Sequence, residues 1–232
     1  MSIMAILEEI LEWERELFLS LNGVHSLYAD IFLWLYSGPA GWVPIVIFAT
    51  GCIIAKTTWK EWGLLILSLG LVILFCDLIS SHLTKPFFAR LRPTHHPFFM
   101  DEVKTVFEKR GNLYGFISGH SANSFGLMMF TALFFKHKPY TGLITLWAIV
   151  MVYSRIYMGM HFISDVVGGI LAGMLIGFLV YRLFLYAHRR LLSEPAFIGY
   201  SPRQKKIITG TIAGYLALFA LISYPLSICL LN

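Results

Sequence analysis

Residues 62–83, WGLLILSLGLVILFCDLISSHL, decide the class of fold. Asp77 is the one charged side chain in this run, and most of the other residues are aliphatic. An α-helix needs about 20 mostly apolar residues to cross the hydrocarbon core of a bilayer. The stretch therefore predicts a helix that spans a membrane.

The composition of the whole chain agrees with a membrane protein. Hydrophobic residues make up 57% of the 232 residues and charged residues 13%, and the mean hydropathy is +0.71. Soluble domains average about 25% charged residues. The net charge of +5 is expected to set membrane topology, so we predict the bilayer as a partner and no binding of nucleic acid.

Further apolar runs are predicted to span the bilayer at about 41–56, 120–136, 140–160, 164–186 and 207–230. Residues 26–37 are too short to span, and we expect an interfacial or re-entrant piece there.

An amphipathic pattern occupies residues 5–20, where aliphatic and acidic residues alternate at helical spacing. The two sets are Ile6, Leu7, Ile10, Leu11 and Leu17 against Glu8, Glu9, Glu12 and Glu16. A helix of this kind lies on a membrane surface. We therefore predict an all-α integral membrane protein, a six-transmembrane-helix bundle with an amphipathic N-terminal interfacial helix, in one domain over residues 1–232.

Loop charge predicts the orientation. With six spans, the segments 56–61, 136–140 and 187–206 share one face. They carry Lys56, Lys60, Lys136, Lys138, Arg189, Arg190, Arg203, Lys205 and Lys206. Cytoplasmic loops are enriched in Lys and Arg, so we expect a plasma (inner) membrane protein with this face in the cytoplasm. The long segment 84–119, which is also basic, then lies on the extracytoplasmic side.

The first cluster of candidate functional residues is KPFFARLRP, residues 85–93, at the end of the second span. On a helix, Lys85 and Arg92 would lie two turns apart on one face. Two cations directed at one point suit an anion, and a guanidinium offers a planar fork to phosphate oxygens. Taken alone, the segment fits an ordinary basic loop at a membrane edge better than an anion site.

The second cluster is Ser118-Gly119-His120, which opens the third span. The start of a helix presents free N–H groups and the positive end of the helix dipole, and both favour an anion. Gly119 permits close approach of the backbone to a ligand. Ser118 also fits a simple N-cap.

The third cluster is Ser154-Arg155, followed by His161 and Asp165. If this segment is helical, His161 and Asp165 lie four residues apart on one face and touch. A carboxylate bonded to one imidazole nitrogen fixes the tautomer and leaves the other nitrogen free to attack. A structural ion pair is the alternative, although ionisable residues at membrane depth are more often functional.

Each cluster lies at a predicted outer end of a span, so all of them are expected to meet in one pocket. Together they supply cations, a helix start, two histidines and a carboxylate, which suits in-line displacement on phosphate. No HExxH, paired-carboxylate or Cys/His metal pattern accompanies them, so we expect neither a metal nor another cofactor.

In their order and spacing, the motifs resemble the signature of the type 2 phosphatidic acid phosphatase superfamily, which reads KxxxxxxRP, SGH and SRxxxxxHxxxD. The matching residues here are 85–93, 118–120 and 154–165. The second motif of the family commonly begins with Pro, and Ile117 stands in that place. We expect this departure to alter the turn slightly and not the chemistry.

The resemblance implies a role for each site residue. His161 would be the nucleophile on phosphorus, and Asp165 would orient it. His120 would protonate the leaving oxygen and then activate water. The phosphate would be held by Lys85, Arg92, Ser118, Gly119 and Arg155. The family forms a phosphohistidine intermediate and works without a metal.

The expected function is metal-independent hydrolysis of a phosphomonoester or diphosphate on a membrane lipid. Polyprenyl diphosphate is slightly preferred by analogy with small members of the family, and phosphatidylglycerol phosphate, phosphatidic acid and lipid A phosphate stay open. A lipid phosphotransferase with the same intermediate and a non-enzymatic anion-binding or transport protein are the alternatives. The sequence does not indicate an oligomeric state.

Other polar and small residues near the motifs have structural explanations. Asp77 is expected to make a polar contact inside its span, and Arg90, His95 and His96 are expected to be solvated in the outer loop. A small-residue face for close helix packing is predicted from Gly168, Gly169 and Gly173.

Overall fold

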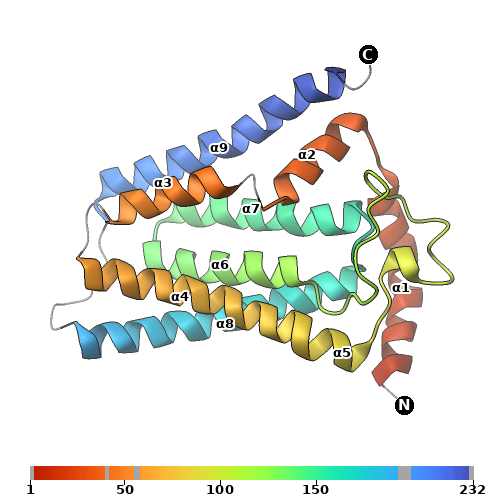
Figure 1. Cartoon of the computed structure of the whole chain (residues 1–232), viewed down its shortest axis with the longest axis horizontal. Coiled ribbons are helices and arrows are strands. Elements are labelled where there is room, and N and C mark those ends of the chain that lie inside the picture. Colours follow the sequence, from red (N-terminus) through yellow and green to blue (C-terminus); the bar gives the residue numbers. More distant parts are fainter. Residues whose placement is uncertain (1–2, 40–41, 55–57, 193–199, 230–232) are drawn as a thin grey trace.

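The computed structural model describes residues 3–39, 42–54, 58–192 and 200–229. Its α-helices are α1 (Ile3–Gly23), α2 (Leu27–Ser37), α3 (Val43–Ile54), α4 (Trp59–Asp77), α5 (Lys85–Phe88), α6 (Gly119–Phe135), α7 (Lys138–Tyr157), α8 (Ile163–Leu191) and α9 (Pro202–Cys229). A π-helix, η2 (Leu78–Thr84), joins α4 to α5, and a 3₁₀ turn, η3 (Pro93–His95), follows α5. The long helices run side by side, and α1 lies across one end of them (Figure 1).

Among the described residues, three helices are long and apolar enough to cross a membrane: Trp59–Phe88, which joins α4, η2 and α5, and the helices α8 and α9. The predicted all-helical membrane class is therefore confirmed. The helices α3, α6 and α7 occupy the places of the other predicted spans. The count of six spans and the interfacial position of α1 stay predictions.

The first predicted span, 41–56, corresponds to α3. Residues 40–41 and 55–57, with Lys56, lie outside the described residues, and α3 covers 43–54. The segment expected to be interfacial or re-entrant forms α2, whose buried residues include Ile31, Leu33 and Tyr36 and which packs against α7 and α9. The helices α2 and α3 follow one another along the bundle (Figure 1). Pro39 disfavours helical backbone in the residue before it, which explains why α2 stops at Ser37.

The closest helix packing joins α6 to α8, and it depends on glycine. A Cβ atom on Gly173 would come 2.2 Å from the carbonyl oxygen of Ala122, and one on Gly169 would come 2.5 Å from that of Ser118. The predicted close packing is confirmed for Gly169 and Gly173, whereas a Cβ atom on Gly168 would meet the side chains of Ile117 and Phe116. At the N-terminal ends of the two helices, the N–H of Ser118 donates to the carbonyl of Asp165 at 2.9 Å. The starts of both helices are thereby fixed together.

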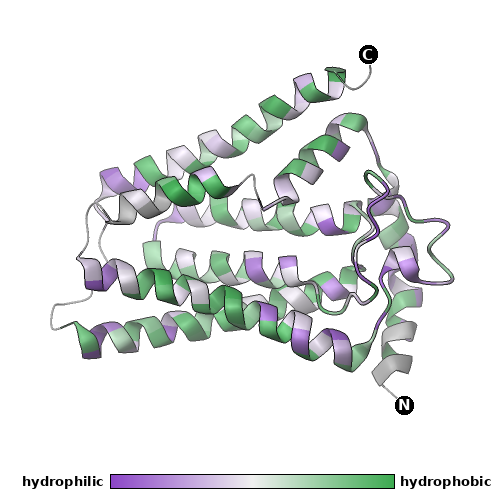
Figure 2. Ribbon diagram, in the orientation of Figure 1, coloured by the Kyte–Doolittle hydropathy of each residue, from purple (hydrophilic) through white to green (hydrophobic). Residues whose placement is uncertain are grey.

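Helix α1 closes the end of the bundle. Leu11, Glu14 and Phe18, spaced by three and four residues, are buried against the other helices. Trp13 and Leu17 are exposed on a different side. Figure 2 shows apolar residues along the long helices and hydrophilic residues gathered in the loop beside α1. This polar end of the molecule carries the candidate site.

Candidate active site

The predicted motifs meet at one end of the bundle. Figure 1 shows α5, the start of α6, the end of α7 and the start of α8 at the end that α1 covers. The cations that lie near enough to act on His120 include Arg155, Arg92 and Lys85, which come from the first and third clusters. All three sequence clusters therefore contribute to one site, as their positions at span ends predict.

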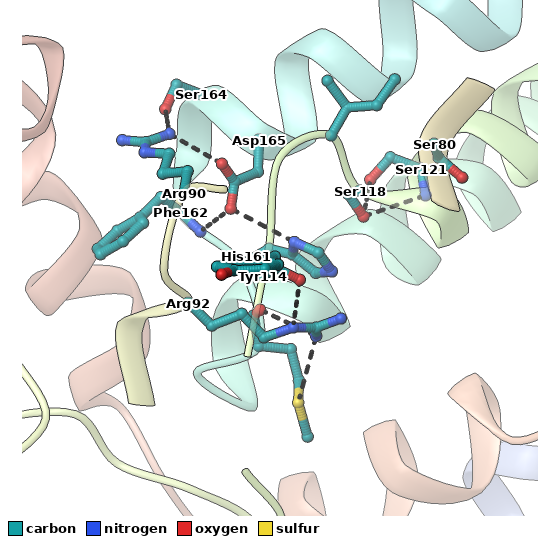
Figure 3. Close-up of polar contacts among 12 residues, drawn as sticks. Ser80, Arg90, Arg92, Tyr114, Ser118, Ser121, His161, Phe162, Ser164 and Asp165 are labelled. Atoms are coloured by element: carbon teal, nitrogen blue, oxygen red, sulfur yellow. Dashed lines mark hydrogen bonds and ion pairs between the residues drawn. The ribbon is translucent and has the colours of Figure 1, made fainter. Parts of the chain in front are cut away.

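His161 and Asp165 form a buried pair at the centre of the site (Figure 3). His161 Nδ1 lies 3.4 Å from Asp165 Oδ2, and the two residues are 2% and 0% exposed. Their contact does not come from helical i,i+4 stacking, because His161 precedes α8. Phe162 is the N-cap and has extended backbone. Asp165 lies in the first turn of α8 and accepts the N–H of Phe162 at 3.1 Å, which turns its carboxylate back toward His161.

This pairing prepares the imidazole for attack. A carboxylate beside Nδ1 favours the tautomer with its proton on Nδ1, which leaves the lone pair of Nε2 free. Burial lowers the pKa of His161 to about 4, with Arg92 and Arg155 acting in the same direction and Asp165 opposing them. His161 is therefore neutral, and nucleophilic, at ordinary pH.

Arg92 lies in the loop after α5, held by backbone carbonyls. Its Nε donates to Tyr114 O at 3.1 Å and its Nη1 to Met160 O at 3.2 Å. These bonds fix the plane of the guanidinium beside the turn that carries His161 (Figure 3). Burial lowers the pKa of Arg92 from its usual value, and Asp165 opposes this.

Lys85 and Arg92 do not share a helical face, contrary to the expectation from their spacing. Helix α5 ends at Phe88, and Ala89 takes a left-handed conformation with φ of 43°. The chain turns there, and the loop brings Arg92 close enough for its charge to act on Lys85. The cations converge through a turn and not through helical periodicity.

Asp77 is linked to Lys85 through the π-helix. Lys85 Nζ donates to Ser81 Oγ at 3.3 Å, and Ser81 Oγ donates to Asp77 Oδ1 at 3.0 Å. This chain of contacts agrees with the structural role expected for Asp77. π-Helical turns occur frequently at functional sites, and this one ends at Lys85.

Arg155 is the most buried of the predicted phosphate-binding cations. It lies near the end of α7 and is 8% exposed. Its Nε lies 3.3 Å from Ser154 Oγ and its Nη2 lies 3.8 Å from Met158 Sδ. A guanidinium has more N–H groups than these two contacts use, so Arg155 keeps donors for an anionic ligand.

The SGH motif forms the start of α6. Ser118 is the N-cap, and its buried Oγ accepts from the N–H of Ser121 at 3.4 Å and from Ser121 Oγ at 2.9 Å. The capping role considered from sequence is therefore present, and a contact of this hydroxyl with phosphate stays a prediction. A Cβ atom on Gly119 would come 2.9 Å from Ser80 Oγ. His120 is exposed, unlike His161, which suits a residue that exchanges protons with water.

The expectation that Arg90 is solvated was wrong. Arg90 is 1% exposed and donates from Nη1 to Asp165 Oδ1 at 2.8 Å and from Nη2 to Glu14 Oε1 at 3.0 Å. His96, also expected in solvent, is buried against Phe162 and Phe99. The loop folds back over the start of α8, so Arg90 and His96 are buried between the loop and this helix.

Glu14 is a site residue that the sequence patterns did not single out. It lies on α1 among several acidic residues, and the amphipathic pattern did not include it in either set. Its spacing from Leu11 and Phe18, three and four residues, is the signal that places Glu14 on the buried side.

Gly115 brings the loop backbone directly onto the His161–Asp165 pair. A Cβ atom there would lie 2.8 Å from Asp165 Oδ2 and 3.3 Å from Arg92 Cγ. The N–H of Gly115 donates to Arg90 O at 2.8 Å, and this hydrogen bond holds the loop segment in position.

Within the described part of the chain, no three His, Cys, Asp or Glu side chains come together as metal ligands. Metal-free chemistry stays a prediction on this evidence.

Comparisons with known proteins place the chain in a family. The sequence profile described as "PAP2 superfamily" matches residues 62–189. A lipid A 4′-phosphatase of Porphyromonas gingivalis is 46% identical over 80% of this chain and 79% of its own length. A lipid A 4′-phosphatase of Bacteroides thetaiotaomicron is 30% identical over 95% of this chain and 99% of its own length.

A more distant relative supports the fold. Phosphatidylglycerophosphatase B of Bacillus subtilis is 30% identical over 59% of this chain and 64% of its own length. The crystal structure of a transmembrane PAP2-type phosphatidylglycerolphosphate phosphatase from the same organism matches with a TM-score of 0.56 and 22% identity, over 77% of this chain and 87% of that one. All three sequence relatives are phosphatases by name, so the predicted enzyme class is confirmed.

Proposed function

This chain belongs to the PAP2 superfamily, and from that membership we propose that it hydrolyses the 4′-phosphate ester of lipid A through a phosphohistidine intermediate. The observation that carries the chemistry is the buried His161–Asp165 pair, which lies among Arg92, Arg155 and Lys85. The substrate comes from the names of the two relatives that match most of this chain.

The first half of the reaction transfers phosphate to the protein. The free Nε2 of His161 attacks phosphorus, and the bond between phosphorus and the sugar oxygen breaks. His120, protonated, gives its proton to that leaving oxygen. The three cations, the start of α6 at Gly119 and the Ser118 hydroxyl hold the phosphate oxygens and offset the charge of the transition state.

The second half releases phosphate. His120, now neutral, takes a proton from a water molecule, whose oxygen attacks phosphorus. The bond between phosphorus and Nε2 breaks, and inorganic phosphate leaves. His161 returns to its neutral form, and Asp165 keeps the proton of its imidazole on Nδ1 throughout.

The proposed orientation places this chemistry on the extracytoplasmic side of the inner membrane. The end opposite to the site carries exposed Lys136, Lys138, Arg189 and Arg190, which suits a cytoplasmic face. A lipid whose phosphate sits at the outer surface would then meet the site at the depth of the head groups.

Lipid A replaces polyprenyl diphosphate as the preferred substrate, because relatives named for lipid A match this chain over most of its length. Phosphatidylglycerol phosphate is the second candidate, since a relative over 59% of the chain is named for it. A phosphotransferase would use the same intermediate and differ only in its acceptor.

The test is phosphate release by the purified protein in detergent with a chelator present. Substrates are lipid A, polyprenyl diphosphate, phosphatidylglycerol phosphate and phosphatidic acid, each given to the wild type and to His161→Ala. We expect lipid A to be hydrolysed fastest and the variant to lose at least about 10³-fold, as for removal of other catalytic nucleophiles. Activity that survives in the variant would exclude the phosphohistidine route, and loss of lipid phosphate without free phosphate would identify a transferase.

A further inference from the structure

Helix α1 lies outside the part of the chain that the family profile matches, residues 62–189, yet it carries a residue of the site. Glu14 is 8% exposed and faces the bundle together with Leu11 and Phe18. A buried carboxylate on a surface helix needs partners, because removing a charge from water is costly unless it is paired.

Both oxygens of Glu14 are engaged by the opening turn of α8. Oε2 accepts the N–H of Ser164 at 2.7 Å, and Oε1 accepts Ser164 Oγ at 2.6 Å. The N–H of Ser164 is one of the first-turn donors that has no partner inside its own helix. A carboxylate there also suits the positive end of the helix dipole. Glu14 therefore fixes the turn that directly follows His161 and Phe162.

The same carboxylate also shares Arg90 with Asp165. Arg90 Nη2 lies 3.0 Å from Glu14 Oε1, while its Nη1 lies 2.8 Å from Asp165 Oδ1 and 2.5 Å from Ser164 Oγ. Figure 3 shows Arg90 reaching Ser164 and Asp165 on the side of the carboxylate away from His161. Without Glu14, Arg90 would have Asp165 as its main carboxylate partner. A stronger attraction to Arg90 would draw the Asp165 carboxylate away from the His161 imidazole.

We propose that Glu14 is a positioning residue for the nucleophile, which acts through Arg90 and Ser164 on the orientation of Asp165 and His161. Helix α1 then contributes to the active site from outside the region that the family profile matches. This inference rests on the roles proposed above for His161 and Asp165.

The test compares Glu14→Gln with Glu12→Gln, an exposed glutamate on the same helix whose substitution changes the net charge equally. In the glutamine variant, an amide NH₂ or oxygen replaces each carboxylate oxygen, so the N–H of Ser164 and Arg90 cannot both keep their acceptor. With lipid A in detergent, we expect kcat to fall about 10- to 100-fold with KM within about twofold, because small misplacements of a reacting group cost this much. Glu12→Gln should match the wild type.

Further measurements separate positioning from loss of fold. The rate of His161 phosphorylation in a single turnover should fall as much as kcat, while the thermal midpoint of the purified variant stays above the assay temperature. Glu14→Gln should also lower kcat by a smaller factor in a Ser164→Ala background than in the wild type, because the effects of substitutions within one hydrogen-bonded network are not additive.

The inference is overturned if Glu14→Gln has the kcat of Glu12→Gln, if its loss equals the fraction of unfolded protein, or if its effect adds fully to that of Ser164→Ala. His161→Ala is measured in parallel. An inactive His161→Ala beside a fully active Glu14→Gln would remove the role of Glu14 and leave the proposed function standing. An active His161→Ala would instead remove the proposed function itself.

Discussion

The two ends of the bundle both carry many cations, and they differ in how these cations are solvated. At the end away from the site, Lys136, Lys138, Arg189 and Arg190 are exposed. At the site, Arg90 and Arg155 are 1% and 8% exposed. Exposed cations cost little and suit a membrane boundary. A buried cation is costly unless it is paired, as Arg90 is with Glu14 and Asp165. Burial therefore separates the cations that we propose to orient the chain from those that we place at the site.

Among substitutions that test this contrast, we expect Arg90→Ala to have the largest effect on stability and activity. The variant leaves Glu14 and Asp165 buried near each other without their shared cation. Breaking a buried pair costs about 3–5 kcal/mol, and we expect a loss of this size in stability together with loss of activity. Thermal unfolding in detergent measures it, with Arg189→Ala as the exposed control at the other end. Equal unfolding of the two variants would contradict the distinction between the ends.

An intermediate effect is expected from Gly115→Ala. The added methyl group would collide with Asp165 Oδ2 at 2.8 Å, so the carboxylate must move away from His161. We expect kcat to fall about 10²-fold, which is typical of misplacement by about 1 Å. Gly142→Ala is the matched control, because a Cβ atom there meets nothing within 4 Å. If both variants keep wild-type kcat, the loop does not define the position of Asp165.

The smallest effect concerns pH and sharpens the contrast between buried and exposed histidines. The pKa of His161 lies at about 4 because of burial, so its neutral form persists well below pH 6.5. Lowering the pH from about 7 to about 5.5 should slow His161 phosphorylation by less than about twofold, whereas a histidine of ordinary pKa would lose about tenfold. By linkage, this group favours the folded state above pH 6.5 and loses that contribution as the pH falls toward 4. Single-turnover rates between these pH values measure the acid limb, and a limb centred near 6.5 would mean that His161 is solvated.

Much of the fold follows from hydropathy. In a membrane, the backbone N–H and C=O groups of an apolar segment must find hydrogen-bond partners within the protein, and a helix provides them. The motif residues were equally visible, since Lys85, Ser118 and Arg155 open or close such runs. The apolar segments of the sequence do not indicate how the chain turns between them. The turn at Ala89, which brings Arg92 back, depended on local backbone geometry that the runs do not encode.

The remaining part of the site depended on contacts between distant segments. Glu14 resembles Glu12 and Glu16 in sequence, and only its neighbours at Leu11 and Phe18 distinguish it. Arg90 resembles any basic residue of an outer loop until Glu14 and Asp165 are known to flank it. Pairings across such separations are set by tertiary packing, so local pattern cannot find them.

The position of Glu14 also bears on how the protein is made. Glu14 leaves the ribosome long before its partners, because Arg90 follows it by 76 residues and Ser164 by 150. Contacts of this span form late, after the segments between them have been synthesised and inserted. If His161 is the nucleophile, as proposed, its surroundings are complete only when α8 has joined the bundle, and we expect the nascent chain to be inactive until then.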